Sequence, residues 1–210
     1  LSIRRQRQMC IRDRNKHTHL VPEELEQLER LSLTGKHMKL QKSLDAFLFC
    51  CYAGMRYSDF TNLSKKNIVD INQETWLIYK SVKTGTEVRL PLYLLFAGKG
   101  IVILNKYRNN LEDFFRLRDN SNINKDLIII AKLAGLSKKI SFHTARHTNA
   151  TLLIYNGVNI TTVQKLLGHK SVKTTQVYTN IMDMTIVHDL EKMKQAALGI
   201  KKKTDNSFNK

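Results

Sequence analysis

The feature that most constrains the fold is a change in the spacing of apolar residues along the chain. Between Thr75 and Leu92 apolar side chains recur at every second position, which indicates extended strands. Thr84-Gly85-Thr86 interrupts this stretch, so we expect a β-hairpin that turns near Gly85 and closes at Pro91. On both sides of the hairpin the apolar spacing is helical. The sequence therefore predicts a mainly α fold with a small antiparallel β-sheet (α+β).

Before the hairpin we expect helices with clear start and stop signals. Pro22, followed by two glutamates, marks a helix start. A second helix runs from about Lys39 and ends at Gly54, and the short helix that follows has Ser58 or Asp59 as its expected cap.

After the hairpin we expect further helices separated by loops. The expected segments are a helix over about 100–117, a polar loop over 118–125 and a helix over 127–134. The last third predicts a run of short helices: one over about 144–155, one capped by Asn159 or Thr161 that ends at Gly168, one capped by Ser171 that carries Tyr178, and an amphipathic segment over Met184–Met193.

The charge balance favours a polyanionic partner. The 210 residues carry 35 Lys and Arg against 18 Asp and Glu, a formal net charge of +17. Residues 1–16 hold +5 of this charge and residues 201–210 hold +3, which leaves +9 on the residues between. A body this basic is typical of a nucleic-acid-binding protein, although a merely soluble basic surface is the simpler alternative.

Composition also bears on compartment and domain organisation. No apolar run approaches the roughly 20 residues of a membrane span, and no signal peptide is evident. Cys10, Cys50 and Cys51 cannot all pair in one chain, so we interpret them as reduced in a cytoplasmic protein. We expect one domain over 19–195, a basic arm over 1–18 that is disordered or not native, and a disordered Lys-rich tail over 196–210.

Cationic side chains precede a tyrosine in the last third of the chain. His143, Arg146 and His147 are followed by His169 and Tyr178. Tyrosine can form a covalent intermediate, and Arg and His stabilise charge on phosphoryl oxygens. This order predicts phosphodiester transfer to Tyr178. Taken singly, each residue has a plainer explanation, such as a helix C-cap for His169 or a core aromatic for Tyr178.

Arg56 and the histidine pair leave alternatives open. Arg56 follows a glycine at a helix start, and its guanidinium can bind a phosphate through two hydrogen bonds. Alternatively, Arg56 can form an ion pair with Asp59. His143 and His147 have the spacing of a helical zinc pair, but Thr144 replaces the general-base glutamate and no third ligand is evident. The sequence contains no Walker-type loop and no carboxylate cluster for Mg²⁺, so we expect neither metal nor cofactor.

Five motifs together resemble the catalytic domain of the tyrosine recombinases, the phage-integrase family. The resemblance covers about residues 19–195 and looks closest to integrases of Bacteroidetes phages and conjugative elements. The motifs, in chain order, are Gly54-Met55-Arg56-Tyr57-Ser58-Asp59, Lys83-Thr84-Gly85, His143-Thr144-Ala145-Arg146-His147, Leu166-Leu167-Gly168-His169 and Thr174-Thr175-Gln176-Val177-Tyr178.

The resemblance implies a site-specific DNA recombinase that needs no metal and no ATP. It implies that Tyr178 attacks the scissile phosphate to form a 3′-phosphotyrosyl link and release a 5′-hydroxyl. Arg56 and Arg146 would clamp the non-bridging oxygens, and His169 would add a hydrogen bond to them. His143 would assist proton transfer around the nucleophile.

The resemblance also implies the leaving-group acid and the partners. Lys83 on the hairpin would protonate the leaving 5′-oxygen, with Lys80 as the alternative if the register differs, because Lys suits a general acid better than Arg. Asp59 would orient neighbouring basic groups. The expected partners are double-stranded DNA and further copies of the chain, in a tetrameric synapse joined through the C-terminal helix, in the bacterial cytoplasm at the nucleoid.

One departure from the family pattern keeps rival functions open. Family members usually carry an N-terminal core-binding domain, which 16 residues cannot supply, so we expect a catalytic fragment or truncated product. A recombinase-like DNA-binding protein without independent activity is the first alternative. A type IB topoisomerase is the second, although such enzymes more often have Lys at the position of His143. A helix-turn-helix transcription factor and a metal-dependent nuclease explain fewer of the motifs.

Overall fold

The structure is a computed structural model that describes residues 18–181. The expected basic arm, the Lys-rich tail and the Met184–Met193 segment lie outside the described residues, apart from residue 18 of the arm. The helices are α1 Pro22–Glu29, α2 Gln41–Ala53, α3 Tyr57–Thr61, α4 Lys99–Lys106, α5 Leu111–Phe115, α6 Asn120–Leu133, α7 Phe142–Tyr155, α8 Ile160–Leu166 and α9 Val172–Thr175. The 3-10 turns are η1 Gly35–Leu40, η2 Lys65–Asn67, η3 Leu95–Gly98 and η4 Gln176–Ile181, and the strands are β1 Ile68–Ile71, β2 Glu74–Lys80 and β3 Glu87–Pro91.

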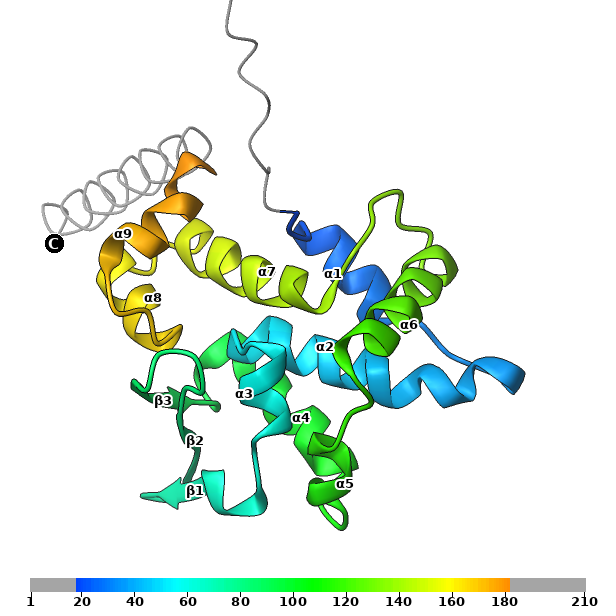
Figure 1. The fold of residues 1–210 in the computed structure, drawn as a ribbon, viewed down its shortest axis with the longest axis horizontal. Coiled ribbons are helices and arrows are strands. Elements are labelled where there is room, and N and C mark those ends of the chain that lie inside the picture. Colours follow the sequence, from blue (N-terminus) through cyan, green and yellow to red (C-terminus); the bar gives the residue numbers. More distant parts are fainter. Residues whose placement is uncertain (1–17, 182–210) are drawn as a thin grey trace, which may run out of the picture.

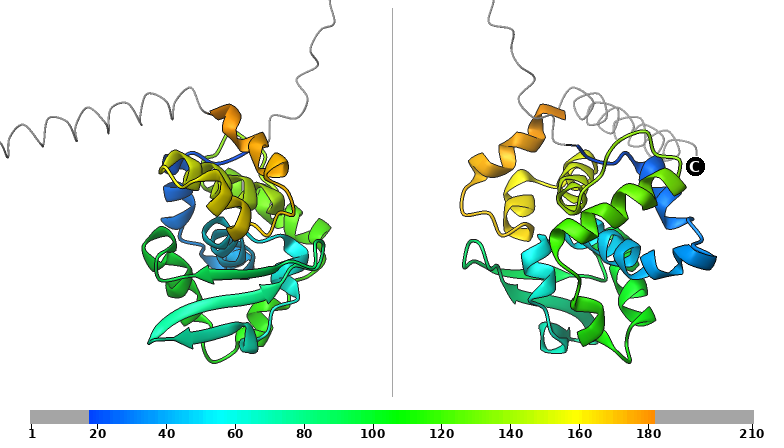
Figure 2. Two further views of the ribbon diagram at one scale, coloured as in Figure 1. Left: turned by 90° about the vertical axis from the view of Figure 1, so that its left-hand side faces the viewer. Right: turned by 45° about the vertical axis from the view of Figure 1, so that its right-hand side comes forward.

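The predicted mainly helical fold with a small antiparallel sheet is confirmed (Figure 1). The sheet has the order β1-β2-β3, and Tyr79 faces Val88 across the hairpin. In both views of Figure 2 the sheet lies in the lower part of the molecule, and α7, α8 and α9 (yellow-green to orange) lie above it. Within residues 18–181, no helix combines the length and apolar character of a membrane span.

Helix α2 is the centre of the core. Every residue from Ser43 to Ala53 is buried, and α2 packs against α1, α4, α5, α6 and α7. A helix that is buried on all sides needs partners for its polar groups. Ser43 donates to Asp126, and Asp45 accepts from Lys106 and from the hydroxyl of Tyr107. The position of α2 is therefore fixed by polar as well as apolar contacts.

Several local predictions are wrong for identifiable physical reasons. Strand β1 was not expected, because its turn to β2 uses Asn72 and Gln73 at φ 54° and 66° and contains no glycine signal. The expected loop over 118–125 is largely the start of α6, whose N-cap Asp119 accepts a hydrogen bond from the amide of Asn122. The polar residues of this turn lie on an exposed helix face around buried Ile123.

Two further boundaries differ from expectation. The helix expected over 100–117 is broken between α4 and α5, where the side chain of Asn110 caps α5. Neither Ser58 nor Asp59 caps α3; the N-cap is Arg56, whose side chain makes no capping bond. Asp59 lies inside α3 and faces the hairpin instead.

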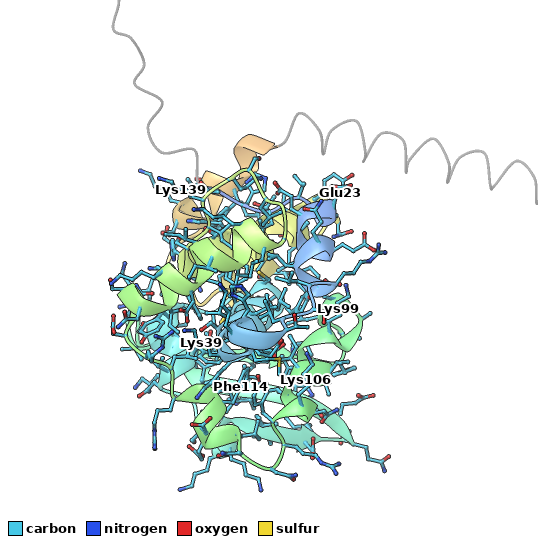
Figure 3. All side chains as sticks on the ribbon, turned by 90° about the vertical axis from the view of Figure 1, so that its right-hand side faces the viewer. Glu23, Lys39, Lys99, Lys106, Phe114 and Lys139 are labelled. Carbon is cyan, nitrogen blue, oxygen red and sulfur yellow. The ribbon has the colours of Figure 1, made fainter. Side chains whose placement is uncertain are left out.

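An aromatic cluster holds α3 against the core. Phe60 contacts the rings of Phe49, Phe114, Phe115 and Phe142 at centroid distances of 5.9, 5.3, 5.5 and 6.1 Å. Phe114, labelled in Figure 3, is fully buried, as is Phe60. Because Phe60 is one residue from Asp59 and four from Arg56, this cluster also positions the residues that precede it in α3.

We expect Phe60→Ala to lower the free energy of unfolding by about 3–5 kcal/mol, because it removes a ring at the centre of this cluster and leaves a cavity. Urea unfolding followed by circular dichroism measures the loss. Val102→Ala is the matched control: Val102 is 62% exposed, so the change should stay within about 0.5 kcal/mol. A loss below about 1 kcal/mol for Phe60→Ala would show that the cluster is not a main source of stability.

Candidate active site

Arg146 joins three helices at the centre of the site. It lies on α7, is 1% exposed, and donates from Nη1 to the carbonyl of Gly54 and from Nη2 to the carbonyl of Leu167, both at 2.7 Å. Those carbonyls stand at the C-terminal ends of α2 and α8, where the helix itself supplies no partner. Burial, together with the charge of Arg56, lowers the pKa of Arg146 to about 10, so the guanidinium stays charged at neutral pH.

Gly54 makes the approach of α2 to α7 possible. Its φ of 66° ends α2 in the left-handed region, and a Cβ there would lie 2.6 Å from Oδ1 of Asn149. Nδ2 of Asn149 donates to the carbonyls of Cys51 and Tyr52 at 2.9 Å. The last turn of α2 is therefore bound to α7 by two side chains.

Arg56 and Asp59 connect α3 to the hairpin. Arg56 lies 3.4 Å from Oδ2 of Asp59 and donates to Oγ of Ser81 at 3.2 Å. Buried Asp59 also accepts from the amide of Val82 at 2.8 Å and from the hydroxyl of Ser81. The ion pair that the sequence left as an alternative for Arg56 is thus present, and it orients the guanidinium.

Lys83 lies between two anchors of the hairpin turn. On one side the amide of Val82 binds Asp59, and on the other Oγ1 of Thr84 donates to the carbonyl of Gly168 at 3.1 Å. The side chain of Lys83 is exposed and lies within the turn, whereas exposed Lys80 lies at the end of β2. The structure therefore places Lys83 in a loop tied to the rest of the site, without bringing its ammonium into contact with the other residues.

His169 follows a tight turn at the end of α8. Gly168 has φ 62°, and a Cβ there would lie 2.6 Å from Cγ2 of Val88 on β3. Nδ1 of His169 lies 2.9 Å from the hydroxyl of Thr175. Burial, followed by the charges of Arg146, Arg56 and His143, lowers the pKa of His169 to about 4, so its imidazole is neutral at pH 7 and can donate one hydrogen bond to an anion.

Tyr178 lies on η4 and contacts α7. It is 6% exposed, and its hydroxyl lies 3.0 Å from Nδ1 of His147. Burial raises the pKa of Tyr178, while the charges of Arg146 and Arg56 act in the opposite direction.

His143 is exposed on the first turns of α7, and its ring meets that of His147 edge-on at a centroid distance of 4.4 Å. The structure thus gathers Arg56, His143, Arg146, His169 and Tyr178 into one Arg-His-Tyr cluster, with Lys83 in the adjoining turn. Among residues 18–181, no group of three or more His, Cys, Asp or Glu is arranged to hold a metal ion.

The side chains that hold this cluster in place were not predicted from the sequence. Ser81 and Thr175 carry no signal of their own, since a serine or threonine becomes informative only when its partner is known. His147 did carry a signal, its position one turn after His143 and beside Arg146, but the sequence suggested only a zinc pair for it.

The chain is similar to known proteins over most of its length. A model of the phage integrase family matches residues 19–184. A tyrosine recombinase of Pseudothermotoga lettingae is 30% identical over 181 residues, which cover 84% of this chain and 60% of that protein. The tyrosine recombinase XerC of Rickettsia prowazekii is 29% identical over 185 residues, covering 83% of this chain and 58% of the relative. The chain therefore spans about three fifths of the length of these relatives.

Solved structures share the fold. The crystal structure of XerA recombinase superposes with a TM-score of 0.63 at 25% identity, covering 85% of this chain and 66% of that one. A lambda integrase dimer bound to a COC′ core site gives a TM-score of 0.58 at 21% identity, covering 77% and 58%. With the family match over most of its length, the chain belongs to the phage integrase family of tyrosine recombinases.

Proposed function

We propose that this chain carries the catalytic domain of a site-specific DNA recombinase, which cleaves and rejoins DNA through a 3′-phosphotyrosyl intermediate without metal or ATP. The observation that carries the proposal is geometric: Arg146 donates to the carbonyls of Gly54 and Leu167, which precede Arg56 and His169 by two residues each. The hydroxyl of Tyr178 contacts His147, the residue that follows Arg146. Cationic and hydrogen-bonding groups fixed around a buried hydroxyl are what an in-line attack on a phosphodiester requires.

The geometry supports a division of roles. The hydroxyl oxygen of Tyr178 forms a bond to phosphorus as the bond from phosphorus to the 5′-oxygen breaks. Arg56 and Arg146 hold the non-bridging oxygens, and neutral His169 donates a hydrogen bond to them. Lys83 delivers a proton to the leaving 5′-oxygen, Asp59 positions Arg56 and the hairpin turn, and His143 assists in moving the proton of the nucleophile.

The proposed partner is double-stranded DNA. The net charge of +17 supports it, and solved relatives in this family include XerH bound to difH DNA and lambda integrase bound to a core site. We further propose a homo-oligomer, tetrameric in the synapse, joined through the C-terminal segment. We also propose, from the motifs, that the chain is most similar to integrases of Bacteroidetes phages and conjugative elements. The protein would act in the bacterial cytoplasm, at the nucleoid.

A second candidate concerns the 210 residues taken alone: they bind DNA but do not recombine it by themselves. The chain spans 60% and 58% of the length of two recombinase relatives. On this second candidate the 210 residues bind DNA through phosphate contacts, with a steep salt dependence and little sequence specificity.

We expect a covalent protein–DNA complex with nicked duplexes of randomised core sequence in EDTA, and its complete loss in Tyr178→Phe. The phenol oxygen is the only atom that the substitution removes. Denaturing gel electrophoresis detects the complex. Tyr93→Phe, which changes a partly buried tyrosine beside Trp76 on the hairpin side, is the control that should keep it. DNA binding without any covalent complex would favour the second candidate.

We expect Lys83→Ala to slow cleavage by about 10²–10⁴-fold on normal DNA, the usual contribution of a general acid. A substrate with sulfur in place of the bridging 5′-oxygen should restore the rate, because a thiolate leaves without protonation. Single-turnover cleavage of both substrates measures the effect. Lys80→Ala is the matched control on the same hairpin, and rescue of Lys80→Ala in place of Lys83→Ala would move the acid to Lys80.

A further inference from the structure

The nucleophile of the proposed function touches a histidine to which the sequence motifs assign no role. Nδ1 of His147 lies 3.0 Å from the hydroxyl oxygen of Tyr178, and the two ring centroids are 5.5 Å apart. Both side chains are buried, His147 with 7% and Tyr178 with 6% of its surface exposed. His143, by contrast, is exposed and touches the ring of His147.

The contact is built on a firmly held element. His147 follows Arg146, whose side chain binds the ends of α2 and α8, and precedes Thr148, whose hydroxyl donates to the carbonyl of Thr144 and accepts from the amide of Leu20. The η4 turn that carries Tyr178 packs on α7. His147 is therefore fixed in position on a rigid helix, which is what a group acting on a nucleophile requires.

Chemistry at Tyr178 requires a proton acceptor at this place. Burial raises the pKa of Tyr178, so the phenol is protonated at neutral pH despite the nearby guanidiniums. A phenol attacks phosphorus effectively only as it loses that proton, and a general base must lie within hydrogen-bonding distance of it. Nδ1 of His147 meets this requirement in the tautomer that carries its proton on Nε2.

We propose that His147 is a catalytic residue that accepts the proton of Tyr178 during attack on DNA. The inference rests on the proposed function. As the bond from the tyrosine oxygen to phosphorus forms, the hydroxyl proton moves to Nδ1 of His147, which becomes an imidazolium. The bond to the 5′-oxygen breaks, and that oxygen takes a proton from Lys83. In rejoining, His147 returns its proton to the departing phenolate oxygen.

This assignment makes the part that the resemblance implies for His143 more specific. His143 lies at the surface with its ring edge-on to His147, so the pair connects the buried hydroxyl to solvent. Among residues 18–181, the charged and titratable groups around the step include His143 on α7, Tyr178 on η4, and the guanidiniums of Arg146 and Arg56, which act on Tyr178. His143 assists by exchanging the proton, while His147 takes it first.

The first test is single-turnover cleavage by His147→Asn, whose amide can keep a hydrogen bond to Tyr178 but cannot take a proton. We expect a loss of about 10²–10⁴-fold near pH 7, typical of a missing general base, that shrinks as rising pH ionises the phenol. The bridging-sulfur substrate should not restore His147→Asn, although it restores Lys83→Ala. His37→Asn, on η1 away from the cluster, is the control that should cleave normally. Normal cleavage by His147→Asn, or rescue by sulfur, overturns the proposal.

The second test needs no DNA and separates this inference from the proposed function. Nitrogen-15 NMR of the histidine rings in the full chain should show Nδ1 of His147 without a proton, and its signal should shift in Tyr178→Phe. A protonated Nδ1 in the neutral ring overturns the assignment, because that nitrogen could not accept. If the wild-type chain cleaves no substrate, the proposed function fails, and the NMR result still decides whether His147 accepts from Tyr178.

Discussion

The site depends on the buried guanidinium of Arg146 and the two carbonyls to which it donates. Removing a charge from water is costly unless its donors find partners. Here the partners are carbonyls at the C-terminal ends of α2 and α8, and no amide of the same helix is available to donate to them. One side chain thus satisfies two helix ends and keeps its charge, because the carbonyls are neutral. The positions of α2, α7 and α8 are thereby linked through a group that also belongs to the chemistry.

This linkage explains why two glycines stand where they do. Gly54 and Gly168 both have positive φ, and a Cβ on either would collide with a neighbour at 2.6 Å. The backbone therefore approaches α7 at one turn and β3 at the other more closely than any side chain would allow. Arg56 follows the first glycine by two residues and His169 follows the second directly. The turns that permit close packing are the same turns that carry the two groups proposed to bind phosphate, so one set of residues would specify both packing and the proposed function.

The sequence predicted the parts of this arrangement that depend on local pattern. The apolar alternation located the hairpin, and Pro22, Gly54 and Ser171 marked helix ends where the structure has them. It failed where a signal is weak: the β1–β2 turn at Asn72 and Gln73 has no glycine, and α6 starts with a polar turn that resembles a loop. Tertiary packing decides both cases.

The site also contains some residues that the sequence identifies and others that only the fold identifies. The members of the Arg-His-Tyr cluster were named through the resemblance of five ordered motifs to a known family, because each residue taken singly also has a plainer explanation. The side chains that hold the cluster in place cannot be identified from the sequence, because their partners are distant along the chain. Ser81 meets Arg56 across 25 residues and Asn149 meets the end of α2 across nearly 100, so no spacing rule finds them. His147 was noticed, but its partner Tyr178 is 31 residues away and only the fold identifies it.

A proton acceptor beside Tyr178 is consistent with the charge balance of the other site residues. Among the site residues that the structure describes, two guanidiniums, those of Arg56 and Arg146, lie near one carboxylate, that of Asp59. His169 is neutral, so these four groups together carry one net positive charge. A phosphodiester neutralises that charge when it binds. In the transition state the phosphoryl group gains a second negative charge, and a fixed site must supply a matching positive one without moving. Transfer of the phenol proton to His147 creates an imidazolium at that moment, next to the group whose charge has grown. The ground state thus avoids an excess of buried positive charge, and the added charge appears only when the reaction calls for it.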